Sequence, residues 1–148
     1  MKTRFFFFDN GQYGMDTEEV PPLQADQILV KTTRSLISVG TETACNTGKP
    51  SWKKGRHGYS SVGRVVEIGS AVKNVGVGDR VATSRIHTDT YVCDPRSGCY
   101  RIPDEVSDED ATFLVLGMVA MHVVERAELT LGRPAVVVGL GTVGQLAQ

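Results

Sequence analysis

The chain has 148 residues, of which 41% are hydrophobic and 22% are charged, and its formal net charge at pH 7 is −1. These values are typical of a folded globular protein with one domain of ordinary size. A charge so close to zero gives no electrostatic basis for binding nucleic acid or an anionic membrane. The longest apolar stretch, residues 111–124, is too short to span a bilayer. The three cysteines (Cys45, Cys93 and Cys99) form no even disulfide framework, so we expect reduced thiols in a cytoplasmic protein.

Most of the chain predicts a mainly β domain. Short β-branched and aromatic runs alternate with turns that contain glycine or proline, the pattern of a β-barrel or sandwich. The expected strands lie at residues 5–8, 27–37, 61–69, 80–83, 91–93 and 97–102. A short helical turn is expected at residues 42–45. It precedes an irregular polar loop, residues 46–56, that carries Trp52.

The pattern becomes helical after Pro103. Ser107 is placed to cap a helix, and acidic residues 108–110 occupy its first turn. Residues 111–127 are helical by composition, and we expect a bend near Gly117. His122 lies in this apolar helix and is expected to be a hydrogen-bonded core histidine. The change in composition divides the chain into a β-rich domain, residues 1–128, and the start of an α/β domain, residues 129–148.

A glycine motif lies near the end of the chain. The β-branched run Ala135–Val138 precedes Gly-x-Gly-x-x-Gly and helix-favouring residues, the order of a strand, a tight turn and a helix that receives a pyrophosphate. The first glycine would make the turn, the second would let the backbone approach the phosphates, and the third would let the helix pack against the strand. The predicted binding residues for NAD or NADP are Gly139, Gly141, Thr142, Val143 and Gly144.

Three blocks of sequence, in this order, resemble the medium-chain dehydrogenase/reductase superfamily. The first is Gly63–Gly69 continued by Val77–Val81, similar to "G-x-V-V-x-V-G…V-G-D-R-V". The second runs from Ile102 to Ala111, similar to "L-P-D-x-x-S-x-E-x-A", and the third is the glycine motif. The resemblance implies a GroES-like, partly opened β-barrel that holds substrate, followed by a Rossmann domain. It also implies hydride transfer between NAD(P) and a small carbonyl, alcohol or activated alkene.

The sequence departs from the zinc-dependent members of this superfamily. Those members carry Cys-Gly-[Ser/Thr]-Asp and Gly-His-Glu stretches, which supply or support the ligands of a catalytic zinc. Here the first stretch is Ser38–Glu42, without cysteine, and Tyr59 occupies the histidine position of the second. Only Cys93 and Cys99 fall in the region of the structural-zinc lobe. A zinc site needs three or four converging ligands, so the resemblance implies a zinc-free member with no metal site. The stretches Ile37–Glu42 and Gly58–Ser60 also resemble a threonine-dehydrogenase-like or bacteriochlorophyllide-dehydrogenase-like subgroup.

Four residues are candidates for the substrate site. Thr41 matches the hydroxyl that relays protons in the zinc-dependent relatives, although it also suits a cap for the turn after Gly40. Tyr59 is placed to donate a proton or to stack on substrate, or else its hydroxyl simply bonds to the backbone. We predict Thr41 and Tyr59 as catalytic residues and Ser38 and Trp52 as pocket residues. Glu42 is expected to serve structure.

The chain supplies one Rossmann strand and barely one helical turn after the glycine motif. We therefore expect an N-terminal portion of a longer enzyme that does not bind a dinucleotide tightly by itself. The expected partner is a small-molecule substrate, not nucleic acid or a membrane. One alternative is a free-standing GroES-like binding or assembly module, in which the open edge of Ala135–Val138 favours homo-oligomers. A second alternative is a zinc alcohol dehydrogenase with displaced ligands.

Overall fold

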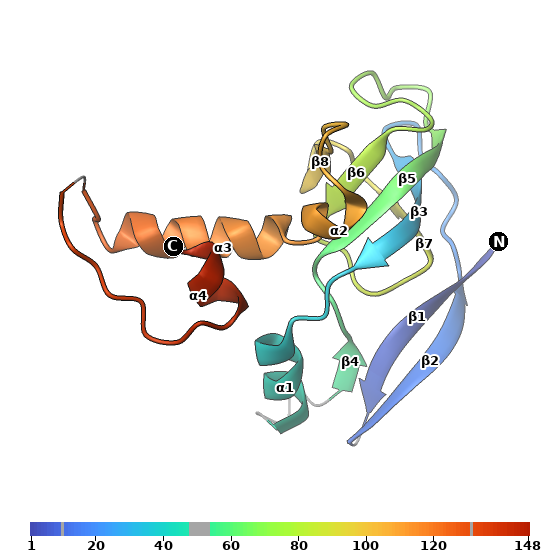
Figure 1. Ribbon diagram of the computed structural model, residues 1–148. Coiled ribbons are helices and arrows are strands. Elements are labelled where there is room, and N and C mark those ends of the chain that lie inside the picture. The colour runs from blue at the N-terminus through green and yellow to red at the C-terminus, as the bar shows by residue number, and fades with distance from the viewer. Residues whose placement is uncertain (10, 48–53, 131) are drawn as a thin grey trace.

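The computed structural model describes residues 1–9, 11–47, 54–130 and 132–148. Its strands form two antiparallel sheets (Figure 1). The three-stranded sheet has the order β2-β1-β4 and consists of β1 (Lys2–Asp9), β2 (Gln12–Glu19) and β4 (Lys54–Arg56). The five-stranded sheet has the order β7-β3-β5-β6-β8 and consists of β3 (Ile28–Ser35), β5 (Ser61–Ile68), β6 (Arg80–Thr83), β7 (Thr90–Cys93) and β8 (Cys99–Arg101). The expected mainly β fold is confirmed.

The smaller sheet begins with a long hairpin. β1 and β2 pair along their whole length, and Gly11 adopts the left-handed φ of +85° that the tight turn requires. The sequence predicted only turns and loop where β2 lies, because most β2 side chains are exposed and no apolar face marks the strand. Backbone hydrogen bonds also join β1 to the chain before β7: Phe6 N donates to His87 O, and Asp89 N donates to Arg4 O.

The five-stranded sheet contains the main core. Ile28 and Val30 of β3, Val65 of β5 and Val81 of β6 are almost completely buried in one apolar cluster. Each such side chain stabilises the fold by about 1.5–3 kcal/mol. The glycine that opens the first sequence block has a structural reason, since a Cβ on Gly63 would lie 2.5 Å from Lys31 O and 2.7 Å from a Val30 methyl.

The helices differ from the prediction in length and position. α1 (Val39–Thr47) is longer than the expected turn at residues 42–45. The expected helix after Ser107 divides into α2 (Asp108–Ala111) and α3 (Leu114–Arg126), so the break lies before Leu114 and not near Gly117. Ser107 caps α2 as predicted, because its Oγ accepts a hydrogen bond of 3.0 Å from Asp110 N.

His122 is not a core histidine. Its side chain is 68% exposed, and the residues that α3 buries among those described are Leu116 and Ala120. With about 100° between successive residues, His122 lies on the opposite side of α3 from Ala120. The error arose because an apolar helix was assumed to be buried on every face.

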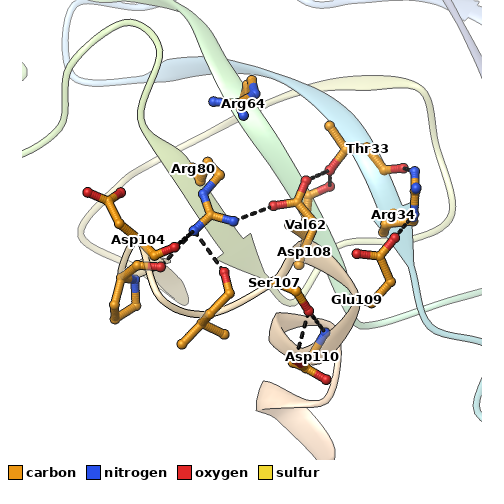
Figure 2. A network of polar contacts seen from close by, with 12 residues as sticks. Thr33, Arg34, Val62, Arg64, Arg80, Asp104, Ser107, Asp108, Glu109 and Asp110 are labelled. Carbon is orange, nitrogen blue, oxygen red and sulfur yellow. Dashed lines mark hydrogen bonds and ion pairs between the residues drawn. The ribbon is translucent and has the colours of Figure 1, made fainter.

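A polar joint ties α2 to the sheet (Figure 2). Arg80 Nη1 donates to Asp108 Oδ1 at 2.9 Å, and Arg80 Nη2 donates to the carbonyls of Pro103 and Val106. The other carboxylate oxygen of Asp108 accepts from Thr33 Oγ1 at 2.7 Å. The second sequence block is therefore bound directly to the arginine of the first.

The charge balance of this joint shifts the ionisation of Asp108. Burial opposes the charged carboxylate, but the hydrogen bonds from Thr33 and Arg80 and the arginine charge outweigh it, so the pKa of Asp108 lies below its usual range. Beyond α2, the carbonyl of Thr112 accepts a hydrogen bond from the buried hydroxyl of Ser60. The end of α2 is thus also fixed to the chain that enters β5.

The segment after α3 does not form the predicted strand. Residues 135–138 are not part of any sheet in the described chain, and Val136 and Val138 are 88% and 94% exposed. A strand needs a ladder partner for its backbone groups, and the described residues provide none here. The short α4 (Thr142–Leu146) lies beside α3 (Figure 1). Within the described residues, no helix combines the length and apolarity needed to cross a membrane.

Candidate functional site

Three of the four predicted substrate-site residues meet through their hydroxyl groups. Tyr59 OH donates to Ser38 Oγ at 2.6 Å, Ser38 Oγ lies 3.3 Å from Thr41 Oγ1, and Thr41 Oγ1 lies 3.4 Å from Tyr59 OH. We call these three side chains the hydroxyl cluster. The fourth residue, Trp52, lies outside the described residues.

Local structure explains how the cluster forms. Ser38 directly precedes α1, and Thr41 lies on the first turn of that helix, so both hydroxyls stand at its N-terminal end. Tyr59 comes from the connection between β4 and β5 and is half-buried. Its hydroxyl contacts two side-chain hydroxyls rather than the backbone. The phenol is therefore held in a fixed direction by groups that can both donate and accept protons.

A second polar chain, which the sequence analysis missed, lies beside the cluster. Glu42 Oε1 accepts from Ser38 N at 3.0 Å and contacts His87 Nε2 at 3.1 Å. The other ring nitrogen of His87 lies 2.8 Å from Ser35 Oγ. Glu42 and His87 are 9% and 6% exposed. Glu42 thus fixes the backbone of Ser38, the residue before α1.

No sequence signal pointed to His87. It lies 45 residues from Glu42, and it belongs to no motif. The contact depends on the backbone hydrogen bonds that bring the chain before β7 against β1. The spacing of residues in the sequence does not reveal such a contact between distant segments.

The metal-ligand positions of zinc-dependent relatives hold no zinc-binding groups here. Val39, which takes the cysteine position, is 73% exposed, and Tyr59 takes the histidine position. Within the part of the chain that the structure describes, no three His, Cys, Asp or Glu side chains converge as a metal site would require.

The glycine motif adopts a backbone suited to close approach by a ligand. Gly139 has a φ of +93°, a conformation that favours glycine. Gly141 is the N-cap of α4, and the position of a Cβ there is open, with nothing within 4 Å. A Cβ on Gly144 would instead collide with the carbonyl oxygen of Gly139. Thr142 and Val143 are the first two residues of α4.

Sequence comparison relates the chain to dehydrogenases. It is 30% identical over 115 residues to (R,R)-butanediol dehydrogenase of Bacillus subtilis (60% of this chain, 33% of that protein) and 25% identical over 175 residues to sorbitol dehydrogenase of Bos taurus (90% and 47%). It is also 33% identical over 90 residues to squalestatin hexaketide synthase clz14 of Cochliobolus lunatus (54% and 4%). The chain therefore spans less than half the length of each of these curated relatives. No protein-family model matches the chain.

Solved structures share the fold. The 2R,3R-butanediol dehydrogenase of Bacillus subtilis superposes with a TM-score of 0.82 at 20% identity, over 98% of this chain and 53% of that one. A zinc-binding dehydrogenase of Sinorhizobium meliloti 1021, solved bound to NADP, gives 0.80 at 20% identity over 99% and 52%. The fold, the sequence relatives and the three motif blocks agree: the homologues and structural neighbours of this chain are medium-chain dehydrogenases/reductases, a superfamily of oxidoreductases.

Proposed function

We propose that this chain is the substrate-side part of an NAD(P)-dependent oxidoreductase that works without zinc. The reaction is hydride transfer between the nicotinamide and a small alcohol or carbonyl compound, or an activated alkene. The observation that carries the proposal is the hydroxyl cluster, in which Thr41 and Tyr59 match positions that hold or support the metal in zinc-dependent relatives. The dehydrogenase relatives support the reaction class.

The cluster would supply the proton that hydride transfer requires. When a carbonyl carbon gains a hydride, its oxygen must gain a proton, and a positioned phenol can donate it. Tyr59 is the donor in this proposal, and Thr41, which donates a hydrogen bond to the Tyr59 oxygen, stabilises the phenolate that remains. Ser38 accepts from Tyr59 at 2.6 Å and orients its hydroxyl. In the oxidation direction, the same groups take the proton from the alcohol.

NAD or NADP, when bound, supplies or accepts the hydride. The turn from Gly139 to Gly144 would hold its pyrophosphate, since the open backbone at Gly141 admits phosphate oxygens to the N–H groups of Thr142 and Val143. We propose that the substrate domain ends at residue 128 and the cofactor side begins at residue 129. The left-handed φ of 51° at Glu128, the residue after the C-cap of α3, supports this boundary.

The test is a comparison of Tyr59→Phe with Tyr100→Phe. Tyr100 on β8 is 46% exposed and lies outside the cluster, so it is a matched control. Both substitutions are made in the oxidoreductase of which this chain is proposed to be the substrate-side part, and its oxidation of NADH and NADPH is followed with a panel of small carbonyl compounds. We expect Tyr59→Phe to lower kcat by about 10²–10⁴-fold, the usual contribution of a general acid, and Tyr100→Phe to leave kcat unchanged. Equal rates in the two variants would remove Tyr59 from the reaction.

Metal content provides a separate test of zinc independence. Elemental analysis of the purified protein should give far less than one zinc per chain, and a chelator should leave the reaction rate unchanged. Stoichiometric zinc together with loss of activity on chelation would instead support the alternative of an alcohol dehydrogenase with displaced ligands.

A second function, as a binding or assembly module, is favoured by one observation. The apolar side chains of Val136 and Val138 are almost fully exposed, and unpaired apolar segments of this kind associate readily. In this case the chain would form homo-oligomers through residues 135–138 and would show no dinucleotide-dependent activity.

A further inference from the structure

Cys93 and Cys99 lie at the two ends of the turn that joins β7 to β8. Cys93 is the last residue of β7, and Cys99 is the first residue of β8. Although the turn is short, these two strands occupy opposite edges of the five-stranded sheet. Both cysteines are free thiols, and Cys99 packs against the apolar cluster to which the buried Cys93 belongs. The fold therefore places one thiol from each open edge of the sheet beside the other.

Hydrogen bonds hold the ends of the two edge strands in place. Ser97 N donates to Asp94 O at 3.2 Å within the turn, and β8 then pairs with β6 so that Cys99 lies opposite Thr83. The hydroxyl of Thr83 lies 2.6 Å from the hydroxyl of Tyr91 on β7, in a buried contact. Because β6, β7 and the turn are tied together in this way, the two thiols meet without any rearrangement of the strands.

The groups around the two sulfurs make them chemically unequal. A hydrogen bond from the Cys99 thiol lowers the pKa of Cys93, and the guanidinium of Arg85 lowers it further, although burial and the Asp94 carboxylate act in the opposite direction. Arg85 is exposed, and its guanidinium carbon lies 5.9 Å from the centroid of the Tyr91 ring. The pKa of Cys99 is raised, because its hydrogen bond to Cys93 and burial both favour the protonated form. Cys93 is thus the sulfur that ionises first.

Two other roles for the pair fit these observations less well. A cysteine that only fills core space behaves as a small hydrophobe, and burial alone would raise its pKa instead of lowering it. A structural zinc needs four ligands, and in the described part of the chain no group of three or more His, Cys, Asp or Glu side chains converges. Adjacent thiols of which one ionises readily are instead typical of sites that oxidise reversibly.

The surroundings of the pair also limit the kind of oxidant. Cys93 is buried, whereas Cys99 is partly exposed and Arg85 is exposed. An oxidant therefore reaches the Cys93 sulfur only if it is small enough to pass beside these two side chains. Hydrogen peroxide meets this requirement, and it reacts with thiolates rather than with thiols.

We propose that Cys93 and Cys99 form a redox-modification site, at which hydrogen peroxide converts the two thiols to a disulfide. The Cys93 thiolate attacks one peroxide oxygen, the O–O bond breaks, and the leaving hydroxide takes up the proton that Cys93 has released. The Cys99 sulfur then attacks the sulfenic acid on Cys93, so that the S–S bond forms, the S–O bond breaks, and the hydroxyl group leaves as water with the Cys99 proton. The sulfurs lose two electrons in all, the peroxide gains them, and two water molecules are released.

The disulfide would join the two edge strands of the sheet covalently. The proposal does not depend on the oxidoreductase function, since neither the hydroxyl cluster nor the glycine motif contributes to the pair.

Trypsin allows a direct test because it cleaves the chain between the two cysteines, at Arg96, and so places them in different peptides, residues 86–96 and 97–101. The 148-residue chain is treated with hydrogen peroxide, its remaining thiols are alkylated, and the digest is analysed by mass spectrometry without reductant. We expect the two peptides to be joined, with the loss of two hydrogen atoms, and to separate after treatment with dithiothreitol. Separate alkylated peptides after peroxide treatment, or either peptide joined mainly to the peptide of Cys45, would overturn the proposal.

Cysteine variants assign the roles of the two sulfurs. In Cys99→Ser the sulfenic acid on Cys93 has no thiol to attack it, so dimedone should label Cys93. Cys45→Ser is the matched control, because Cys45 lies on α1, and it should leave the link between the two peptides unchanged. Circular dichroism confirms that each variant is folded. Folded Cys99→Ser that takes up no dimedone at Cys93 would overturn the order of attack.

Arginine variants test the charge beside Cys93. Arg85→Met should slow disulfide formation about threefold or more, because loss of the positive charge raises the pKa of Cys93 and leaves less thiolate. Arg126→Met, at the exposed end of α3, is the control and should leave the rate unchanged. Equal rates in the two folded variants would contradict the assignment of Cys93 as the sulfur that Arg85 activates.

Discussion

Replacing Arg80 by methionine should destabilise the fold far more than replacing a neighbouring surface arginine. The Arg80 side chain is 15% exposed and that of Asp108 is 20% exposed. The substitution removes the hydrogen bonds to Asp108 and to the carbonyls of Pro103 and Val106, the last two at 2.6 and 2.8 Å. Methionine retains much of the apolar stem, so the lost polar contacts dominate the effect.

The size of the loss in free energy of unfolding depends on the environment of the Asp108 carboxylate that remains after the substitution. Breaking a buried ion pair by removing one partner costs about 3–5 kcal/mol, because the other charge is left uncompensated. Asp108 keeps its bond from Thr33 and has some solvent contact, which places the loss near the lower end. We therefore expect a decrease of about 3 kcal/mol in the free energy of unfolding at pH 7.

The assay is chemical denaturation at a series of pH values, with Arg34→Met as the matched control. Arg34 bonds Glu109, the next residue of α2, at 2.7 Å, but both side chains are more than half exposed, so its loss should change stability little. The pKa of Asp108 is depressed in the folded state. Its stabilisation is therefore complete above the unfolded pKa of about 3.9 and is lost as the pH falls through the lower folded value.

The difference in free energy of unfolding between the natural chain and Arg80→Met should accordingly be largest above about pH 5 and should decrease in acid. Two results would contradict this reasoning. One is an equal loss of unfolding free energy in Arg80→Met and Arg34→Met. The other is a stability difference between the natural chain and Arg80→Met that stays constant down to the pH at which Asp108 is protonated.

Three further predictions test other features. Gly63→Ala should lower the free energy of unfolding by about 1–3 kcal/mol through overpacking between β3 and β5, whereas Gly76→Ala, where the nearest atom to a Cβ is 3.9 Å away, should have little effect in the same denaturation assay. His122→Ala should change stability by less than about 0.5 kcal/mol, and a loss above about 2 kcal/mol would restore the core interpretation of this histidine. If residues 135–138 mediate association, light scattering after size exclusion should show oligomers that the double substitution Val136→Asp and Val138→Asp converts to monomers; a monomeric natural chain would contradict this.

The sequence predicted those features that depend on local chemistry. Ser107 has the side chain and the following acidic turn of an N-cap, and it caps α2. Thr41 and Tyr59 were selected because they occupy positions aligned with the metal-site motifs of relatives, and Ser38, a predicted pocket residue, directly precedes the first of these motifs. Their hydroxyls do meet, although their catalytic role stays a proposal.

The errors arose where tertiary contacts decide the outcome. β2 has almost no apolar face and exists because β1 offers it a full ladder of hydrogen bonds. Conversely, residues 135–138 have strong β propensity but no ladder partner in the described chain. The Glu42–His87 contact joins two distant segments, and no sequence motif marks either residue as a partner of the other. For α3, composition alone could not show which side of the helix faces solvent.

Through the hydrogen bond from Ser60 to the carbonyl of Thr112, the contacts of Arg80 also constrain residues beyond α2. Arg80 holds the first turn of α2, the residue after α2 holds Ser60, and Ser60 is the chain neighbour of Tyr59. The order of the tyrosine ring is thus linked mechanically to an arginine on a different strand. Loosening the joint should be detectable as faster amide hydrogen exchange at the entry to β5 and as wider rotamer sampling by Tyr59.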